Sequence, residues 1–191
     1  MSDLTEIRWH ARAGQGAVTA SKLLAETALL KGKYIQAMPE YGPERTGAPL
    51  RAYTRISDVP IDLHNNIVKP GIVVVLDETL LAVVDVLEGL DENGFLLLNT
   101  TKDVATIREE LGVPETIKIA VVDASGIALQ TIKRDIPNTP VVGALAHVTN
   151  VATVEALKEN LVIDFGKKFT QEIVDANLAS VDRAVQEVVC Q

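Results

Sequence analysis

Apolar and polar positions follow two different periods along this chain, and the two periods predict alternating strands and helices. Ile7 and Trp9 alternate with Arg8 and His10, which indicates a β-strand. Residues 17–30 lack glycine and proline and consist mostly of alanine and leucine, which favours a helix. Continuous apolar runs, which are typical of strands buried on both faces of a parallel sheet, occupy residues 72–76, 94–99 and 117–122.

Helical spacing of the apolar residues predicts further helices between and after these runs. They cover residues 79–90, 103–111, 124–132, 141–148 and 153–160. A last helix begins near Thr170, and its apolar residues make one stripe, which we expect to close the core of the domain rather than to dock on a partner. The stripe consists of Ile173, Val174, Leu178, Val181, Val185, Val188 and Val189.

The segments between the first helix and residue 66 carry a weaker pattern. Residues 34–38 indicate a short strand, and residues 50–56 alternate, which predicts an edge strand or a strand with one face in water. Residues 58–66 are polar and rich in turn formers, so that a hairpin or a short helix is expected there. Three prolines and two glycines fall within residues 39–49, and this density of breakers predicts a shaped loop.

Repeated alternation of strand and helix predicts the fold class. We expect a single domain over residues 1–191, with a doubly wound, mostly parallel α/β sheet and helices on both faces. Asp77, Asn99 and Asp123 then fall at the carboxyl ends of three strands, the edge at which such sheets bind ligands. For each of them taken singly, we favour a local role at the start of the following helix.

Composition and charge exclude several classes of function. An apolar content of 47% allows a sizeable core, whereas a net charge of −8 argues against nucleic-acid binding, which needs clustered lysine and arginine. No apolar run has the length of a signal peptide or a membrane span, so that a cytoplasmic protein without membrane contact is expected. Cys190 is the only cysteine, and one thiol can form neither an iron–sulfur cluster nor an internal disulfide.

The glycine turn between the first strand and the first helix is the sharpest local feature. Gly14, Gln15 and Gly16 lie where unpaired N–H groups of a helix N-terminus can hold an anion such as a phosphate. The turn lacks the dinucleotide fingerprint of Rossmann-like sheets, because Thr19 occupies the place of its third glycine. Met38 and Pro39 end the second strand where an acidic ribose ligand would be required.

The loop that follows the second strand is a second candidate site. Its adjacent Glu44 and Arg45 are either a local ion pair in a solvated loop or a functional pair, with the Arg45 guanidinium facing an anionic cofactor or a carboxylate of a partner. His10 alternates with apolar residues on a strand, which favours a structural hydrogen bond over a role as a catalytic base. No spacing of nucleophile, base or metal ligands defines a catalytic set.

Five motifs in a fixed order carry a family resemblance over nearly the whole chain. The motifs are AGQGAVTASKLLAE, MPEYGPERTGAPLRAYTRIS, VVVLDETLL, FLLLNT and IPNTPVVGAL. Together they resemble the gamma subunit of pyruvate (2-oxoacid):ferredoxin oxidoreductase, which is equivalent to the gamma domain of the fused enzyme. The resemblance implies cofactor-binding or partner-facing positions at Gly14, Gln15, Gly16, Glu44, Arg45, Gly47, Asn138 and Thr139.

The resemblance also implies a function and a set of partners. The chain would be a subunit, without cofactors of its own, of an enzyme that decarboxylates a 2-oxoacid, pyruvate foremost, on thiamine diphosphate with Mg²⁺. That enzyme reduces ferredoxin through [4Fe–4S] clusters and transfers the acyl group to coenzyme A. Those cofactors would lie on the alpha, beta and delta (ferredoxin-like) subunits, and the isolated chain would be inactive. Two other hypotheses are a stand-alone nucleotide-binding oxidoreductase and a purely structural assembly subunit.

Overall fold

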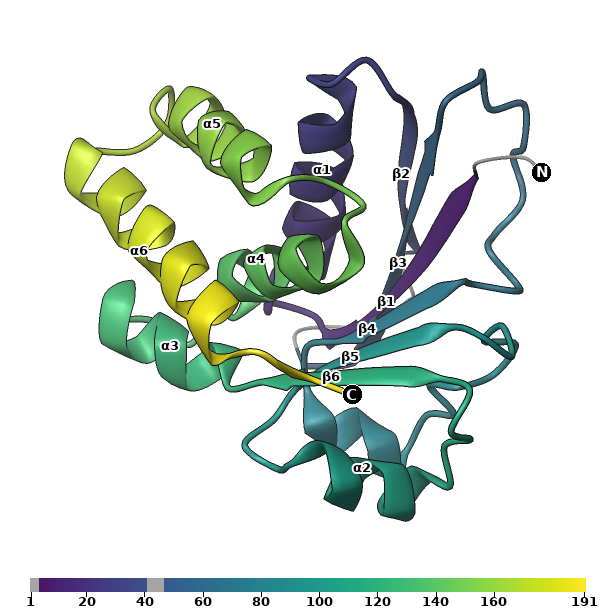
Figure 1. Cartoon of the computed structure of the whole chain (residues 1–191). Coiled ribbons are helices and arrows are strands. Elements are labelled where there is room, and N and C mark those ends of the chain that lie inside the picture. The colour runs from purple at the N-terminus through teal and green to yellow at the C-terminus, as the bar shows by residue number, and fades with distance from the viewer. Residues whose placement is uncertain (1–3, 41–46) are drawn as a thin grey trace.

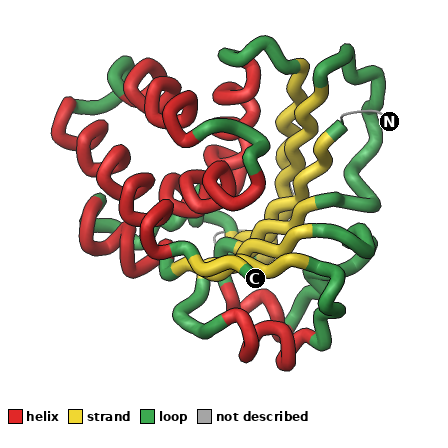
Figure 2. The backbone as a smooth tube through the Cα atoms, in the orientation of Figure 1, coloured by secondary structure: helices red, strands yellow, loops and turns green. Residues whose placement is uncertain are grey.

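The computed structural model describes residues 4–40 and 47–191, and these residues build a seven-stranded sheet with helices on both of its faces (Figures 1 and 2). The strands are β1 (Thr5–Arg12), β2 (Tyr34–Glu40), β3 (Pro49–Ser57), β4 (Ile72–Val75), β5 (Phe95–Asn99), β6 (Lys118–Val122) and β7 (Val189–Cys190). The helices are α1 (Ala17–Leu29), the 3₁₀ helix η1 (Glu78–Ala82), α2 (Val104–Leu111), α3 (Ala124–Thr131), α4 (Asn138–Thr149), α5 (Val154–Phe165) and α6 (Gln171–Glu187).

The sheet is mixed but mostly parallel, as predicted. Its strand order is β2-β3-β1-β4-β5-β6-β7, and β1, β4, β5 and β6 pair in parallel. Strand β3 is antiparallel to both β1 and β2, and β7 is antiparallel to β6. Since β2 therefore runs in the direction of β1, five of the seven described strands point the same way.

Alternate residues of the central strands belong to two separate hydrophobic cores, one on each face of the sheet. In β4, Ile72 and Val74 belong to the core under α1 and α3–α6, whereas Val73 and Val75 belong to the core under α2. Figure 1 shows this division, with α2 on one side of the sheet and the other α-helices on the opposite side. Strands buried on both faces have no polar positions to alternate, which explains the continuous apolar runs of the sequence.

The C-terminal helix closes the larger core, as expected from its stripe. Val174 and Val181 are fully buried, and Leu178 and Val185 pack against the same cluster. Helix α4 lies close beneath α6, because Gly143 lacks a side chain: a Cβ at this position would lie 3.1 Å from Val181 Cγ1.

Strand β3 corrects the expectation of an edge or half-solvated strand. It lies between β2 and β1, and its polar residues from Thr54 onward are buried. Arg55 is 1% exposed and donates to Glu6 Oε1 at 2.8 Å and to Gln36 Oε1 at 3.1 Å. Side-chain pairing across three strands therefore replaces water on this face.

Two further segments differ from their predictions. Residues 58–66 form neither a hairpin nor a helix. Carbonyl groups of this irregular segment accept hydrogen bonds from β2 instead; for example, Gln36 Nε2 donates to Leu63 O at 2.8 Å. The expected helix 79–90 shortens to η1, after which the chain makes turns that bring the Val86 and Glu88 carbonyls to the Arg8 guanidinium. Tertiary hydrogen bonds outweigh the helical periodicity here.

The helix termini are also set by contacts that the apolar period does not encode. The predicted C-terminal stripe ends before Val189. This residue belongs to β7 and pairs with Val121 of β6 instead of continuing α6. Helix α4 begins at Asn138 rather than at residue 141, since Pro140 fits in the first turn of a helix, where its missing N–H needs no partner. None of the helices in the described ranges has the length and hydropathy that spanning a membrane requires.

Candidate functional site

The candidate site lies where the chain leaves the sheet in two opposite directions. After β1 the chain enters α1 over the larger core, and after β4 it enters η1 on the opposite side. Since β1 and β4 are parallel neighbours, their carboxyl ends part at a topological switch point, the edge at which open α/β sheets bind ligands.

The predicted glycine turn forms one wall of this switch point. Gly14 and Gly16 have φ values of 107° and 83°, which L side chains rarely adopt. The side chain of Gln15 accepts from Arg12 N at 2.8 Å and donates to Asp77 Oδ2 at 2.7 Å. The Gln15 side chain therefore joins the two diverging loops.

Asp77 combines a local with a tertiary role. Its Oδ1 accepts from Thr79 N at 2.9 Å and begins η1, and its Oδ2 lies 3.3 Å from Arg12 Nε. Burial raises the pKa of Asp77, but the hydrogen bonds from Thr79 and Gln15 and the charge of Arg12 outweigh it, so that the pKa lies below its ordinary value. The carboxylate is therefore charged at neutral pH and committed to protein partners.

Of the other two strand-end residues, Asp123 has the favoured local role and Asn99 does not, since Asp103 caps α2 and Asn99 bonds across the fold. Asp123 accepts from Gly126 N at 2.8 Å and caps α3. Asn99 donates to Leu76 O at 2.8 Å and accepts from Ser125 N at 3.1 Å, which joins three neighbouring loops at this edge.

Asn138 and Thr139 meet the glycine turn although more than a hundred residues separate them from it. Both are buried at the start of α4, and Asn138 Oδ1 accepts from Thr139 N at 2.8 Å. The Asn138 amide covers Gly16 so closely that a Cβ on this glycine would lie 2.7 Å from Asn138 Nδ2. The tertiary structure thus brings two predicted site segments into contact.

A cavity of about 750 Å³ opens beside this contact. Four predicted residues line it, namely Gly14, Gly16, Asn138 and Thr139. The remaining walls combine apolar residues, among them Ile136, Phe165 and Phe169, with Arg134 and the ion pair of Lys168 and Asp164. A volume of this size accommodates a ligand of several hundred daltons or a segment of another chain.

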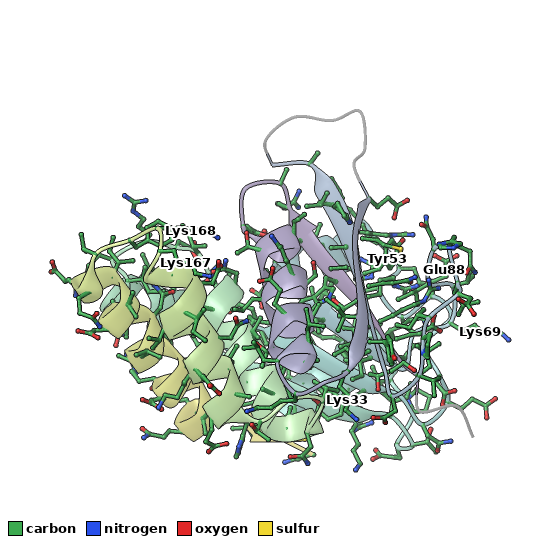
Figure 3. The ribbon with its side chains drawn as sticks, turned by 90° about the horizontal axis from the view of Figure 1, so that it is seen from above. Lys33, Tyr53, Lys69, Glu88, Lys167 and Lys168 are labelled. Atoms are coloured by element: carbon green, nitrogen blue, oxygen red, sulfur yellow. The ribbon has the colours of Figure 1, made fainter. Side chains whose placement is uncertain are left out.

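The sequence did not point to these remaining walls. Lys168 donates to Asp164 at 2.8 Å, and it projects with Lys167 from the link between α5 and α6 (Figure 3). Phe165 and Phe169 make an edge-to-face pair with centroids 5.4 Å apart. Only the packing of α5 and α6 against α4 brings these side chains to the glycine turn, and no local motif encodes that packing.

The second predicted loop is described only at its two ends. Glu44 and Arg45 lie outside the described residues. Gly47, with a φ of 91°, donates its N–H to Ala13 O at 3.1 Å, and its carbonyl accepts from Arg12 at 3.0 Å. The loop base is therefore tied directly to the glycine turn.

His10 has the structural hydrogen bond that its strand position favoured. It is 1% exposed, and its Nε2 accepts from Arg8 Nε at 3.0 Å. Burial, together with the charges of Arg8 and Arg51, lowers the pKa of His10 to about 3. The ring is therefore neutral at physiological pH.

Residues 4–40 and 47–191 contain no preformed metal site. No group of three or more histidine, cysteine or acidic side chains is arranged to hold a metal ion there. Cys190 is an exposed residue of β7, and partial desolvation of its thiol raises its pKa.

These features define an α/β domain with a largely apolar, cation-bordered pocket at the switch point of its sheet, of the type that receives a ligand or a partner chain. The chain belongs to the pyruvate ferredoxin/flavodoxin oxidoreductase family, whose model matches residues 6–187. The family resemblance of the five motifs is thereby confirmed.

Individual relatives match the chain over almost its full length. It is 54% identical to pyruvate synthase subunit PorC of Thermotoga maritima, over 97% of this chain and 95% of that protein. It is 46% identical to the common subunit gamma of the pyruvate/ketoisovalerate oxidoreductases of Thermococcus litoralis, over 86% of this chain and 91% of that protein. The crystal structure of the T. maritima pyruvate oxidoreductase subunit PORC superposes with a TM-score of 0.85 at 49% identity and covers 98% of both chains.

We predict that Gly16→Ala destabilises the protein more than Gly32→Ala does. The two glycines have nearly the same φ, 83° and 81°, but an added Cβ meets nothing within 4 Å at Gly32 and meets Asn138 at Gly16. Gly32→Ala therefore reports the backbone cost alone, about 1–2 kcal/mol, and Gly16→Ala adds a steric cost of about 1–3 kcal/mol. Urea unfolding measures both, and equal losses would contradict the contact. Asn138→Ala should restore part of the loss in Gly16→Ala only.

We predict that His10 makes the stability of the protein fall as the pH drops below about 6.5. Between the unfolded pKa near 6.5 and the folded pKa of about 3, the unfolded chain binds a proton that the native state does not. The free energy of unfolding then falls by at most about 1.4 kcal/mol per pH unit from this group, and His10→Gln removes the slope. Urea unfolding at pH 7, 5.5 and 4.5 measures it.

The control for this experiment is His147→Gln, which makes the same replacement at an exposed position near the end of α4. If the pH profile of His10→Gln ran parallel to that of the wild type, a neutral buried His10 would be wrong.

Proposed function

We propose that this chain is the gamma subunit of a multi-subunit 2-oxoacid:ferredoxin oxidoreductase, with pyruvate as the 2-oxoacid and the cytoplasm as its location. The observation that carries the proposal is the 54% identity, over nearly the full length of both chains, to a pyruvate synthase subunit. The enzyme would decarboxylate the 2-oxoacid, pass the electrons to ferredoxin and transfer the acyl group to coenzyme A.

Thiamine diphosphate, Mg²⁺ and the [4Fe–4S] clusters would be bound by the partner subunits. A [4Fe–4S] cluster needs four thiolates, and this chain contributes one exposed cysteine. The described acidic side chains at the sheet edge are engaged as helix caps and in hydrogen bonds, as Asp77 and Asp123 illustrate. The residues present here therefore do not fit these groups, and we assign this chain no step on them.

Coenzyme A fits the pocket beside the glycine turn better. When bound, it supplies the thiol that accepts the acyl group. Asn138 and Thr139 at the start of α4 would hold one of its phosphates, because the N-terminus of a helix attracts anions. Arg134 adds a positive charge to the wall of the pocket, and Phe169 offers an apolar surface. Gly14 keeps the approach open, since it has no side chain.

The proposed protein partners are the alpha, beta and delta (ferredoxin-like) subunits, with ferredoxin as the acceptor for the assembled enzyme. Exposed apolar side chains cluster around the link between α5 and α6 and suit burial against another subunit; they are Val162, Ile163, Phe169 and Ile173.

The stand-alone nucleotide-binding hypothesis receives less support from the geometry. Asn138 Nδ2 occupies the space next to Gly16, at the place where a dinucleotide pyrophosphate would approach the helix. The purely structural hypothesis differs from ours in one measurable respect, because a scaffold needs no ligand in the pocket of α1, α4 and α6.

We predict that the tagged chain, purified anaerobically from its native host, brings down larger partner chains in a brown complex. This complex should reduce a dye in a reaction that depends on coenzyme A, with pyruvate and branched-chain 2-oxoacids assayed in turn, and the best substrate names the enzyme. The chain expressed alone is the control and should be colourless and inactive. A lone chain from the native host, without partners or activity, would contradict the proposal.

We predict that Asn138→Asp in the assembled enzyme raises the KM for coenzyme A at least tenfold, with kcat at saturation nearly unchanged. The new carboxylate repels the phosphate and keeps Oδ1 as acceptor for Thr139 N, so that α4 retains its first turn. Asn93→Asp adds the same charge in an exposed turn and serves as the control. An unchanged KM would remove coenzyme A from this pocket, and loss of assembly would favour the structural hypothesis.

A further inference from the structure

A buried guanidinium without a carboxylate partner lies on the sheet face opposite α1. Arg8 is 3% exposed, and its partners are neutral: His10 Nε2 at 3.0 Å, Val86 O at 3.0 Å and Glu88 O at 2.6 Å. Among residues 4–40 and 47–191, no carboxylate oxygen comes within ion-pair distance of Arg8, although the charges of Glu88 and Asp85 act on it from farther away. Buried charges in proteins are normally paired, so that this arrangement favours an additional anion nearby.

Arg8 determines which nitrogen of His10 carries the ring proton. An arginine Nε can only donate, so His10 Nε2 is the acceptor and the proton of the neutral ring is on Nδ1. His10 also lines a cavity of about 150 Å³. Its Nδ1–H makes no hydrogen bond to the described residues and is the polar group that the ring has left for a ligand, and the charge of Arg8 on the other nitrogen strengthens it as a donor.

Arg51 supplies a second donor to the same cavity. Its side chain is partly exposed, and its ion pair with Glu88 is long, at 3.8 Å. The acidic residue of the cavity, Glu40, is held by the Tyr53 hydroxyl, which donates to its Oε2 at 2.5 Å. Figure 3 places Tyr53 and Glu88 together on the side of the sheet away from α1.

The remaining cavity wall is apolar and limits what can enter. Pro49, Leu50, Leu80 and Val84 line it beside the two donors. A cavity of this volume holds a group of only a few heavy atoms, and a planar carboxylate matches the fork of a guanidinium.

We propose that this cavity binds a carboxylate group, which accepts hydrogen bonds from His10 Nδ1–H and from the Arg51 guanidinium. The carboxylate comes from one of two sources: a small free monocarboxylate, whose alkyl part contacts Leu80 and Val84, or an acidic side chain of a partner subunit. The binding chemistry is the same for both. The first source is independent of the function proposed above, and only the second rests on it.

The free chain tests the first source by ¹⁵N NMR of the histidine ring, with acetate as the probe. Acetate should shift the His10 Nδ1–H signal in a saturable way, whereas acetamide, which has the same shape and no charge, should not. Arg51→Met should weaken the binding of acetate at least tenfold. Lys69→Met removes the same charge from an exposed site outside the cavity (Figure 3) and should leave the binding unchanged.

The assembled enzyme tests the second source through the affinity of the tagged chain for its partner subunits. If a carboxylate of a partner occupies the cavity, Arg51→Met should weaken assembly at least tenfold, and Lys69→Met should not. Glu88→Gln removes the long ion pair of Arg51 from its other end and should leave assembly intact, which separates the cavity from that ion pair. Melting curves of the free variants confirm that each is folded.

The two measurements together decide the proposal. Saturable binding of acetate that needs Arg51 supports it with a free ligand, and loss of assembly in Arg51→Met alone supports it with a carboxylate of a partner. A His10 signal insensitive to acetate, together with normal assembly of Arg51→Met, would overturn it. Because the NMR titration uses the free chain, it stands even if the chain proves to belong to another enzyme.

Discussion

The hydrogen bond between Gln15 and Asp77 holds together the two loops on which the site depends. These loops leave neighbouring parallel strands toward opposite faces of the sheet, so that nothing in the backbone ladder keeps them in contact. The Gln15 amide spans the gap, and Arg12 reinforces it by its ion pair with Asp77 and its hydrogen bond to the Gly47 carbonyl. The glycine turn, the base of the following loop and the start of η1 therefore form one connected unit at the edge of the sheet.

The central strands and the strands β1, β2 and β3 are covered in different ways. Under the central strands both faces are apolar, because helices cover them on each side. Under β1, β2 and β3, helix α1 covers only one face, and irregular segments cover the other, where Arg8 and Arg55 are buried. These segments use their carbonyl groups to solvate the guanidinium groups, which is why helical or hairpin structure is lost there. Burial and the charge of Arg8 in this polar layer lower the pKa of His10, and the same layer borders a small cavity lined by hydrogen-bond donors.

The predicted site residues differ in where the structure places them, for reasons visible in particular residues. Gly14 and Gly16 stood out because a glycine pair between a strand and a helix requires unusual φ values, and the structure has them. Gln15 was expected to face a ligand or a partner, but its side chain is used inside the fold. Asn138 and Thr139 were identified by family motif rather than by local chemistry, yet they line the same cavity as the glycines. Arg134, Lys168 and Phe169 carried no signal, because they reach that cavity only through the packing of α5 and α6.

Local sequence patterns were sufficient to predict most of the strands and helices in their order, the double winding of the sheet and the family. These follow from local periodicity, from runs of apolar residues and from motifs, all of which are short-range properties. Only the tertiary structure decided that the alternating segment at β3 is interior, that residues 83–90 turn back toward Arg8, and that Val189 and Cys190 add a strand beside β6. The physical reason is the same in each case. The free energy of a buried polar group depends on the partner that it finds across the fold, and a single stretch of sequence does not contain that partner.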